Sequence, residues 1–156
     1  MLYKNIMVAF DGSEPSTEAL VVAKDLIDQD PEATLHVVNV VAVGTLGVGS
    51  NSAFDGVSGL TADASPYNDA LESAKELALE NINDALDDLL SEADFDIEKQ
   101  VVVATKAADG ICEYANDNNI DMIVMGRRGL GAFGAMLGSV SYSVLHQMKI
   151  PVVTVK

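Results

Sequence analysis

A glycine-rich stretch in the last third of the chain holds both arginines of the protein and is well suited to binding an anion. Residues 126–141 read GRRGLGAFGAMLGSVS. Glycines let a backbone turn its N–H groups toward one point, and the helix expected to open at Ser139 adds free N–H groups and the positive end of a dipole. Arg127 and Arg128 could grip a phosphate, or they could simply be solvated on a loop. The alternative for the whole stretch is a flexible connection with glycines for close packing.

A second polar feature, Asp11, ends the first apolar run of the chain. A carboxylate at the end of a buried strand can accept hydrogen bonds from a sugar hydroxyl, or it can merely cap the next turn. In open parallel sheets, ligands bind beyond the carboxyl ends of the strands. We therefore expect residues 11–13 and 126–129 to face each other across such a crevice.

The elements that must position these residues are strands alternating with helices. Strands are expected over residues 2–10, 33–41, 97–104, 120–125 and 151–156. The first two have apolar runs typical of strands buried on both faces, and residues 97–104 alternate first and are then continuously apolar. Helical periodicity begins near residues 14, 66, 107 and 139. Residues 42–64 lack either pattern, which is typical of a lid, a binding loop or disorder. This order predicts one α/β domain over residues 1–156, Rossmann-like, with an open, mainly parallel five-stranded sheet and helices on both faces.

Composition narrows the function classes. The 156 residues include 24 Asp and Glu against 9 Lys and Arg, a net charge of −15, which disfavours nucleic acids and anionic membranes. The predicted helix over residues 66–93 carries many of the acids, as a solvated face or a docking surface. We expect neither a transmembrane helix nor a signal peptide. The single cysteine, Cys112, favours a reducing, cytoplasmic setting.

Four segments together resemble the universal stress protein family. They are MVAFDGSEPSTEAL near the start, LHVVNVV in the second predicted strand, DMIVMGRRGLGAFGAMLGSVSYSVL, and the closing PVVTVK. Nucleotide-binding members of that family carry the pattern G-x2-G-x9-G-[ST]. Gly126, Gly129, Gly138 and Ser139 fit it, except that the last gap has eight residues. The resemblance implies strand order 3-2-1-4-5, a homodimer through the last strand near residues 151–156, and ATP binding.

The resemblance also implies roles for single residues. Asp11 would lie near the ribose or adenine, and the backbone of Val40 would hold adenine. Met125 and Gly126 would line the ribose and the α-phosphate. The phosphates, bridged by Mg²⁺ or Mn²⁺, would contact four further residues, Gly129, Gly138, Ser139 and Val140. The expected binding set is completed by Phe10, Arg127, Arg128 and Ser141. The shortened gap affects the distal phosphates most, so a preference for ADP or AMP is an alternative to ATP.

Several functions fit these features. The first is a cytoplasmic, nucleotide-dependent stress-response switch whose ordered loops are read by a protein partner. The second is a weak Mg²⁺-dependent ATPase, although the sequence lacks the GKS or GKT phosphate loop of efficient hydrolases and an evident general base. The third is a dimeric interaction module that has lost the nucleotide. A flavin or dinucleotide protein fits less well, because the turn DGSE lacks the dinucleotide glycines.

Overall fold

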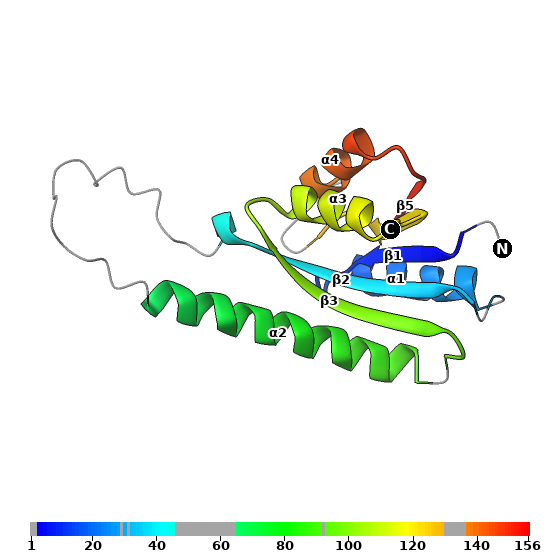
Figure 1. The fold of residues 1–156 in the computed structure, drawn as a ribbon, viewed down its shortest axis with the longest axis horizontal. Coiled ribbons are helices and arrows are strands. Elements are labelled where there is room, and N and C mark those ends of the chain that lie inside the picture. The colour runs from blue at the N-terminus through cyan, green and yellow to red at the C-terminus, as the bar shows by residue number, and fades with distance from the viewer. Residues whose placement is uncertain (1–2, 29, 31, 46–64, 92, 130–136) are drawn as a thin grey trace, which may run out of the picture.

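The computed structural model describes residues 3–28, 30, 32–45, 65–91, 93–129 and 137–156. Strands and helices alternate along the described chain (Figure 1): β1 (Asn5–Ala9), α1 (Glu14–Ile27), β2 (Thr34–Ala42), α2 (Ser65–Leu89), β3 (Asp96–Ala104), α3 (Ala107–Asp117), β4 (Met122–Gly126), α4 (Ser139–Gln147) and β5 (Val152–Val155). A short 3₁₀ turn, η1 (Val43–Thr45), follows β2.

The five strands form one sheet in the order β3-β2-β1-β4-β5, and every pairing is parallel. Both the parallel sheet and its strand order confirm the sequence-based expectation. β1 lies at the centre, between β2 and β4. The chain leaves β1 toward β2 and leaves β4 toward β5, so the strand order reverses between the carboxyl ends of β1 and β4. A crevice for a ligand is expected at that point in such sheets.

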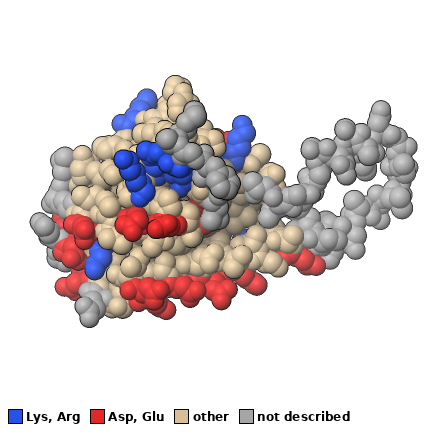
Figure 2. Space-filling model, turned by 180° about the vertical axis from the view of Figure 1, so that it is seen from behind, with Lys and Arg blue, Asp and Glu red and all other residues tan. Residues whose placement is uncertain are grey.

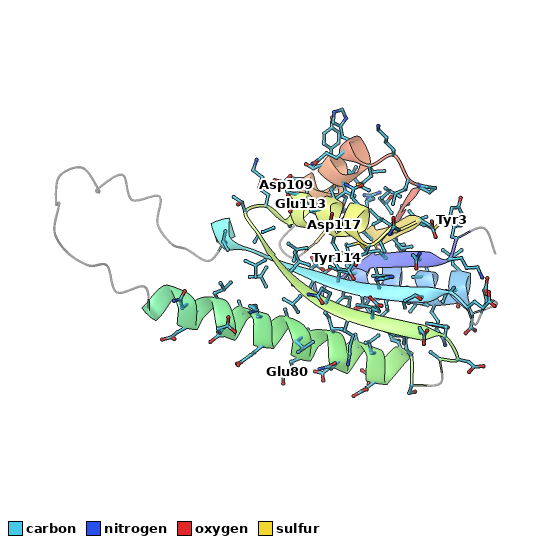
Figure 3. All side chains as sticks on the ribbon, in the orientation of Figure 1. Tyr3, Glu80, Asp109, Glu113, Tyr114 and Asp117 are labelled. Atoms are coloured by element: carbon cyan, nitrogen blue, oxygen red, sulfur yellow. The ribbon has the colours of Figure 1, made fainter. Side chains whose placement is uncertain are left out.

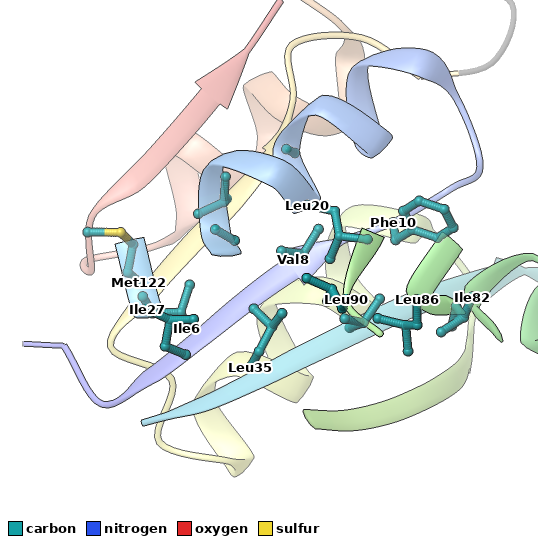
Figure 4. Packing of buried hydrophobic residues seen from close by; sticks show 14 of the residues in the cluster. Ile6, Val8, Phe10, Leu20, Ile27, Leu35, Ile82, Leu86, Leu90 and Met122 are labelled. Atoms are coloured by element: carbon teal, nitrogen blue, oxygen red, sulfur yellow. The ribbon is translucent and has the colours of Figure 1, made fainter. Parts of the chain in front are cut away.

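Each face of the sheet is covered by two helices, which gives two apolar cores. α1 and α2 pack on one face, where Val8, Leu20, Leu35 and Ile82 are fully buried (Figure 4). α3 and α4 pack on the other, around Met7, Ile123 and Val144. Because both faces of the sheet are covered, the central strands β1 and β4 are buried over nearly their whole length, whereas the first half of the edge strand β3 is polar and largely exposed.

Several element ends differ from the sequence-based expectation. The first strand was expected over residues 2–10 but begins at Asn5, because the carboxylate of Asp121 accepts hydrogen bonds from the backbone N–H groups of Lys4 and Asn5, at 2.8 and 2.9 Å. The acidic helix was expected over residues 66–93 but ends at Leu89. Of the expected loop 42–64, Ala42 belongs to β2 and 43–45 form the 3₁₀ turn, while 46–64 lie outside the described residues. Residues 130–136 of the glycine-rich stretch lie outside them too.

Candidate functional site

A cavity of about 260 Å³ lies where the strand order reverses, on the face of the sheet covered by α3 and α4. Its walls come from the ends of β1 and β4, from the second half of β2 and from the N-terminal parts of α1, α3 and α4. These segments are far apart in the sequence and meet because parallel strands all end at the same edge. The cavity therefore occupies the place where the topology predicts a ligand.

One side of the cavity is apolar. Val38 and Val40 of β2, Ile111 of α3 and Met125 of β4 line it. α3 approaches β2 closely at Gly110, where a Cβ would lie 2.7 Å from Cγ1 of Val40, so only glycine fits. This close approach holds Ile111 over the strand ends and forms a slot that suits a flat apolar group.

Asp11 contributes a carboxylate at the end of β1. One of its oxygens, Oδ1, accepts hydrogen bonds from the backbone N–H (3.0 Å) and the hydroxyl of Ser13. Gly12 between them has φ of +79°, a conformation that glycine adopts without strain. Ser13 is also the N-cap of α1, since its hydroxyl accepts from the N–H of Ser16. The turn therefore fixes the Asp11 side chain, whose other oxygen faces Gly129.

The first turn of α4 forms the polar side of the cavity. The N–H of Gly138 donates to the carbonyl of Arg127 at 2.9 Å, and the buried hydroxyl of Ser141 donates to the carbonyl of Gly126 at 2.9 Å. These two bonds tie the start of α4 to the end of β4. Gly138 is the N-cap and has no side chain, so the first N–H groups of α4 receive no hydrogen bond from the cap side chain. Such N–H groups at a helix start favour an anion.

The two adjacent arginines lie in different places. Arg128 lines the cavity, whereas Arg127 lines a neighbouring hollow that also contains Arg128. Of the two arginines expected in the site, Arg128 therefore lines the cavity and Arg127 does not.

Eleven of the twelve residues in the expected binding set line this cavity, namely Phe10, Asp11, Val40, Met125, Gly126, Arg128, Gly129, Gly138, Ser139, Val140 and Ser141. Their role in binding remains a prediction. Five more lining residues were missed, and these are Ala9, Ser16, Val38, Ala107 and Ile111. Val38 could have been predicted from the sequence. Residues two apart on a strand lie on the same face, and Val38 is two residues before Val40.

Metal binding by the protein alone has no support in the described part of the chain, where no three His, Cys, Asp or Glu side chains gather to hold an ion. Asp11 is the acidic residue that lines the cavity. One carboxylate fits a Mg²⁺ ion that is held mainly by the phosphates of a ligand and by water.

A second polar group is buried below the cavity on the same face of β2. Nδ1 of His36 lies 3.0 Å from the Tyr114 hydroxyl and 3.3 Å from the Glu98 carboxylate. Tyr114 lies on the side of α3 that faces the sheet (Figure 3). Burial lowers the pKa of His36 below its usual value of 6.5, although Glu98 opposes the shift. Burial likewise raises the pKa of the Cys112 thiol, which keeps this thiol protonated.

Comparison with known proteins identifies the family. The model of the universal stress protein family matches residues 2–156. The chain belongs to the universal stress protein family. A universal stress protein from Thermus aquaticus is 28% identical over 156 residues, which cover 99% of this chain and 100% of that protein. The family assignment confirms the resemblance seen in the sequence.

Solved structures of the family share the fold. The universal stress protein UspA from Lactobacillus plantarum superposes with a TM-score of 0.78 at 18% identity, covering 100% of this chain and 99% of its own. A universal stress protein in complex with cAMP has a TM-score of 0.66 at 24% identity, covering 100% and 99%. Among the described residues, no helix is both long and apolar enough to cross a membrane.

Proposed function

We propose that this universal stress protein binds an adenine nucleotide, with ATP as its main ligand, in the cavity between the ends of β1 and β4. One observation carries the proposal: a single cavity combines an apolar slot, a fixed carboxylate and a helix N-terminus. These are the groups that a base, a ribose and a phosphate need. The solved family member in complex with cAMP supports an adenine nucleotide as the ligand class.

The base occupies the apolar slot in this proposal. Val38, Val40 and Ile111 offer flat apolar contact, and Val40 is near the end of β2, where backbone groups can reach the edge of adenine. Asp11, which lines the cavity at the end of β1, accepts a hydrogen bond from a ribose hydroxyl. Phe10, the residue before Asp11, is buried in the core on the face covered by α1 and α2.

The phosphates lie at the start of α4. The N–H groups of Ser139, Val140 and Ser141 are at the positive end of the helix, where the dipole favours an anion. Gly129 and Gly138 leave the approach open, because neither has a side chain. Arg128 supplies a positive charge at the cavity wall. A bound Mg²⁺ or Mn²⁺ would bridge phosphate oxygens, with Asp11 as its protein neighbour, and would neutralise phosphate charge.

A thermal melt with nucleotides tests the proposal. Nucleotide-free protein is heated alone and with Mg-ATP, Mg-ADP, AMP or Mg-GTP. A ligand at 100 times its Kd stabilises by about 2.7 kcal/mol, or roughly 5–10 °C in Tm for a domain of this size. We expect this shift with adenine nucleotides and a smaller one with GTP. No shift with any adenine nucleotide contradicts the proposal and favours the interaction module.

Two serine variants locate the ligand. Ser139→Ala removes a hydroxyl from the cavity, and Ser143→Ala removes one from the same helix outside it. We expect Ser139→Ala to lower the ATP-induced shift while Ser143→Ala keeps it. Equal shifts in both variants would show that the Ser139 hydroxyl does not contact the ligand.

Nucleotide binding, we further propose, acts as a switch that a protein partner reads in the cytoplasm. Ordering of the segments that flank the phosphates would create the state that the partner recognises. Hydrogen exchange with and without Mg-ATP tests this. We expect slower exchange in residues 42–64 and 126–138, and unchanged exchange there would refute the switch while leaving binding intact. Cell fractionation tests the cytoplasmic location of the protein.

A homodimer through residues 151–156 completes the proposal. β5 is an edge strand of the sheet. The carbonyls of Pro151 and Val155 accept from β4, so by alternation the backbone groups of Val152 and Thr154 point away from it. Thr154→Pro removes an outward N–H without touching the β4 pairing. We expect a dimer in sedimentation experiments and a monomer for Thr154→Pro; a monomeric parent protein would refute the dimer.

A further inference from the structure

A buried histidine lies on the strand that carries two residues of the apolar slot. His36 of β2 is 5% exposed, and its side chain lies on the same face of the sheet as Val38 and Val40, because residues two apart on a strand share a face. Val38 and Val40 line the cavity, whereas His36 does not. His36 can therefore act on a ligand of the cavity only through other residues.

Groups from three elements surround the imidazole. Nδ1 faces two of them, the Tyr114 hydroxyl of α3 at 3.0 Å and the Glu98 carboxylate of β3 at 3.3 Å. The Tyr114 ring also lies edge-to-face on the imidazole, with 5.9 Å between the ring centroids. On β1, the residue paired with His36 is Met7, which does not titrate. The other nitrogen, Nε2, is buried and has no hydrogen-bond partner among the described residues.

This second nitrogen decides which protonation state fits the site. A neutral imidazole has one donor and one acceptor nitrogen, and the Tyr114 hydroxyl can satisfy Nδ1 in either role. A protonated imidazole donates from both nitrogens, which makes Nε2–H a buried, charged donor without an acceptor. Glu98 favours the cation, but its side chain is 60% exposed, so water weakens the attraction. The packed arrangement therefore favours the neutral ring.

Helix α3 connects this ring to the cavity. Tyr114 is three residues after Ile111, so the two side chains lie on the same side of the helix. Ile111 lines the apolar slot, where the close approach of Gly110 to Val40 holds it. A movement of α3 away from β2 gives water access to the imidazole and withdraws Ile111 from the slot at the same time.

The many carboxylates of the chain titrate in a different pH range. Figure 2 shows Asp and Glu side chains along the lower edge of the molecule, where α2 lies, and α2 covers the face of the sheet opposite to His36. Asp and Glu ordinarily titrate at about pH 4, and histidine at about pH 6.5. Burial lowers the pKa of His36 from that value, while Glu98 raises it in part. Between pH 7.5 and 5.0, the two histidines, His36 and His146, are therefore the main side chains that change charge.

We propose that His36 is a positioning residue for the nucleotide: its neutral ring holds α3 against β2 through Tyr114, and its protonation releases α3 and weakens nucleotide binding at acid pH. The inference rests on the proposed function and adds a regulation of the same site. Nucleotide and proton oppose each other, because the nucleotide requires the packed α3 and the proton disfavours it. Linkage makes the effect reciprocal, so bound nucleotide lowers the affinity of His36 for a proton by the same factor.

Nucleotide affinity as a function of pH tests the inference. Titration calorimetry with Mg-ATP gives the Kd at pH 7.5 and 5.0 for the parent, His36→Gln and His146→Gln. His146 is the matched control, an exposed histidine of α4 that does not line the cavity. Phosphates also titrate in this range, but the ratio of two Kd values at one pH cancels that effect. From pH 7.5 to 5.0, we expect the parent and His146→Gln to lose about three- to tenfold more affinity than His36→Gln.

NMR titration of the imidazole signals gives the reciprocal measurement on the unsubstituted protein, so it remains decisive if His36→Gln fails to fold. We expect saturating Mg-ATP to lower the pKa of His36 and to leave that of His146 unchanged. A His36 pKa that is the same with and without nucleotide overturns the inference while nucleotide binding stands. Equal loss of affinity in the parent and in His36→Gln overturns it as well.

Hydrogen exchange separates this inference from the proposed function. If the parent protein binds no nucleotide at pH 7.5, the proposed function fails, and the exchange of the α3 amides, corrected for its intrinsic pH dependence, decides on His36. Lower protection of α3 at pH 5.0 in the parent, but not in His36→Gln, supports the release of α3 by protonation. Equal protection in the two proteins overturns it.

Discussion

The carboxylate of Asp11 lies against the backbone of Gly129, so that a methyl group at position 129 would overlap Oδ2 of Asp11. Asp11 follows β1 and Gly129 follows β4, the two central strands on either side of the reversal in strand order. Their contact joins the two halves of the cavity. The family pattern asks for glycine at this position, and the structure gives a local reason: the space for a side chain is already taken by Asp11.

Gly129→Ala is expected to destabilise the protein through this contact. The alanine methyl forces Asp11 out of its hydrogen bonds with Ser13, at about 1–3 kcal/mol, the usual cost of overpacking. Asp11→Ala makes room, so the double variant should lose less than the sum of the two single losses. Urea denaturation of the four proteins measures this coupling. Additivity to within about 0.5 kcal/mol would show that the two residues do not compete for space.

Gly110→Ala tests the close approach of α3 to β2. A Cβ there lies 2.7 Å from Cγ1 of Val40 and 2.9 Å from Cβ of Ala104. We expect a loss of about 1–3 kcal/mol, despite the better helix propensity of alanine, because α3 must move away from the sheet. Val40→Ala in the same chain should recover part of that loss. A Gly110→Ala protein as stable as the parent would show that α3 moves freely.

Gly12→Ala separates backbone strain from crowding. The nearest atom to a Cβ at this position is Nδ2 of Asn81 at 3.7 Å, so space is available, but φ is +79°. We expect a loss of about 1–2 kcal/mol from the left-handed backbone alone. Gly12→Asn should lose less, since asparagine tolerates this conformation. Thermal denaturation ranks the three proteins, and an asparagine variant less stable than the alanine variant would point to crowding instead.

His36 should make stability depend on pH below neutrality. Its pKa in the folded protein is below the usual 6.5 because the ring is buried, so the unfolded chain takes up the proton first as pH falls. The free energy of unfolding is therefore highest above pH 6.5 and decreases as pH falls through the folded pKa, by at most about 1.4 kcal/mol per pH unit. His36→Gln cannot titrate and should flatten this slope between pH 7 and 5. An unchanged slope would assign the dependence to other groups.

A substitution at Glu98 tests separately what sets the pKa of the His36 imidazole. Its carboxylate lies 3.3 Å from Nδ1 of His36 and raises the His36 pKa against the effect of burial. Glu98→Gln should therefore lower that pKa further. NMR titration of the imidazole signals measures it, with His146→Gln used to assign the two histidines. A pKa that rises in Glu98→Gln would contradict this account of the site.

Much of the fold could be predicted because the signals are local. Strands buried on both faces have continuous apolar runs, and Ser13 followed by Glu14 and Pro15 is a typical helix start. The strand order came from the family resemblance, since a parallel sheet leaves several orders open. The exact ends depended on side chains from distant segments, as with Asp121 at the start of β1.

The cavity was predicted less completely for a related reason. Residues with chemical signals, such as Asp11 and Gly138, were found from the sequence. Ala107 and Ile111 were missed because nothing local distinguishes a lining residue from a core residue; only the tight fit of Gly110 against β2 brings them to the cavity. The contact between His36 and Tyr114 likewise depends on the packing of α3 over β2, which no sequence pattern specifies.

The central place of β1 has a consequence for how the protein is made. Its partners are β2, which follows soon after it, and β4, which leaves the ribosome much later. Phe10 and Asp11 are therefore synthesised long before Gly126 and α4. The edge of β1 that pairs with β4 has no partner strand until β4 has been synthesised. No ligand of the cavity can stabilise the nascent chain during that interval, because the part of the cavity that β4 and α4 form does not yet exist. The early β1–β2–β3 portion must rely on its own apolar core with α1 and α2.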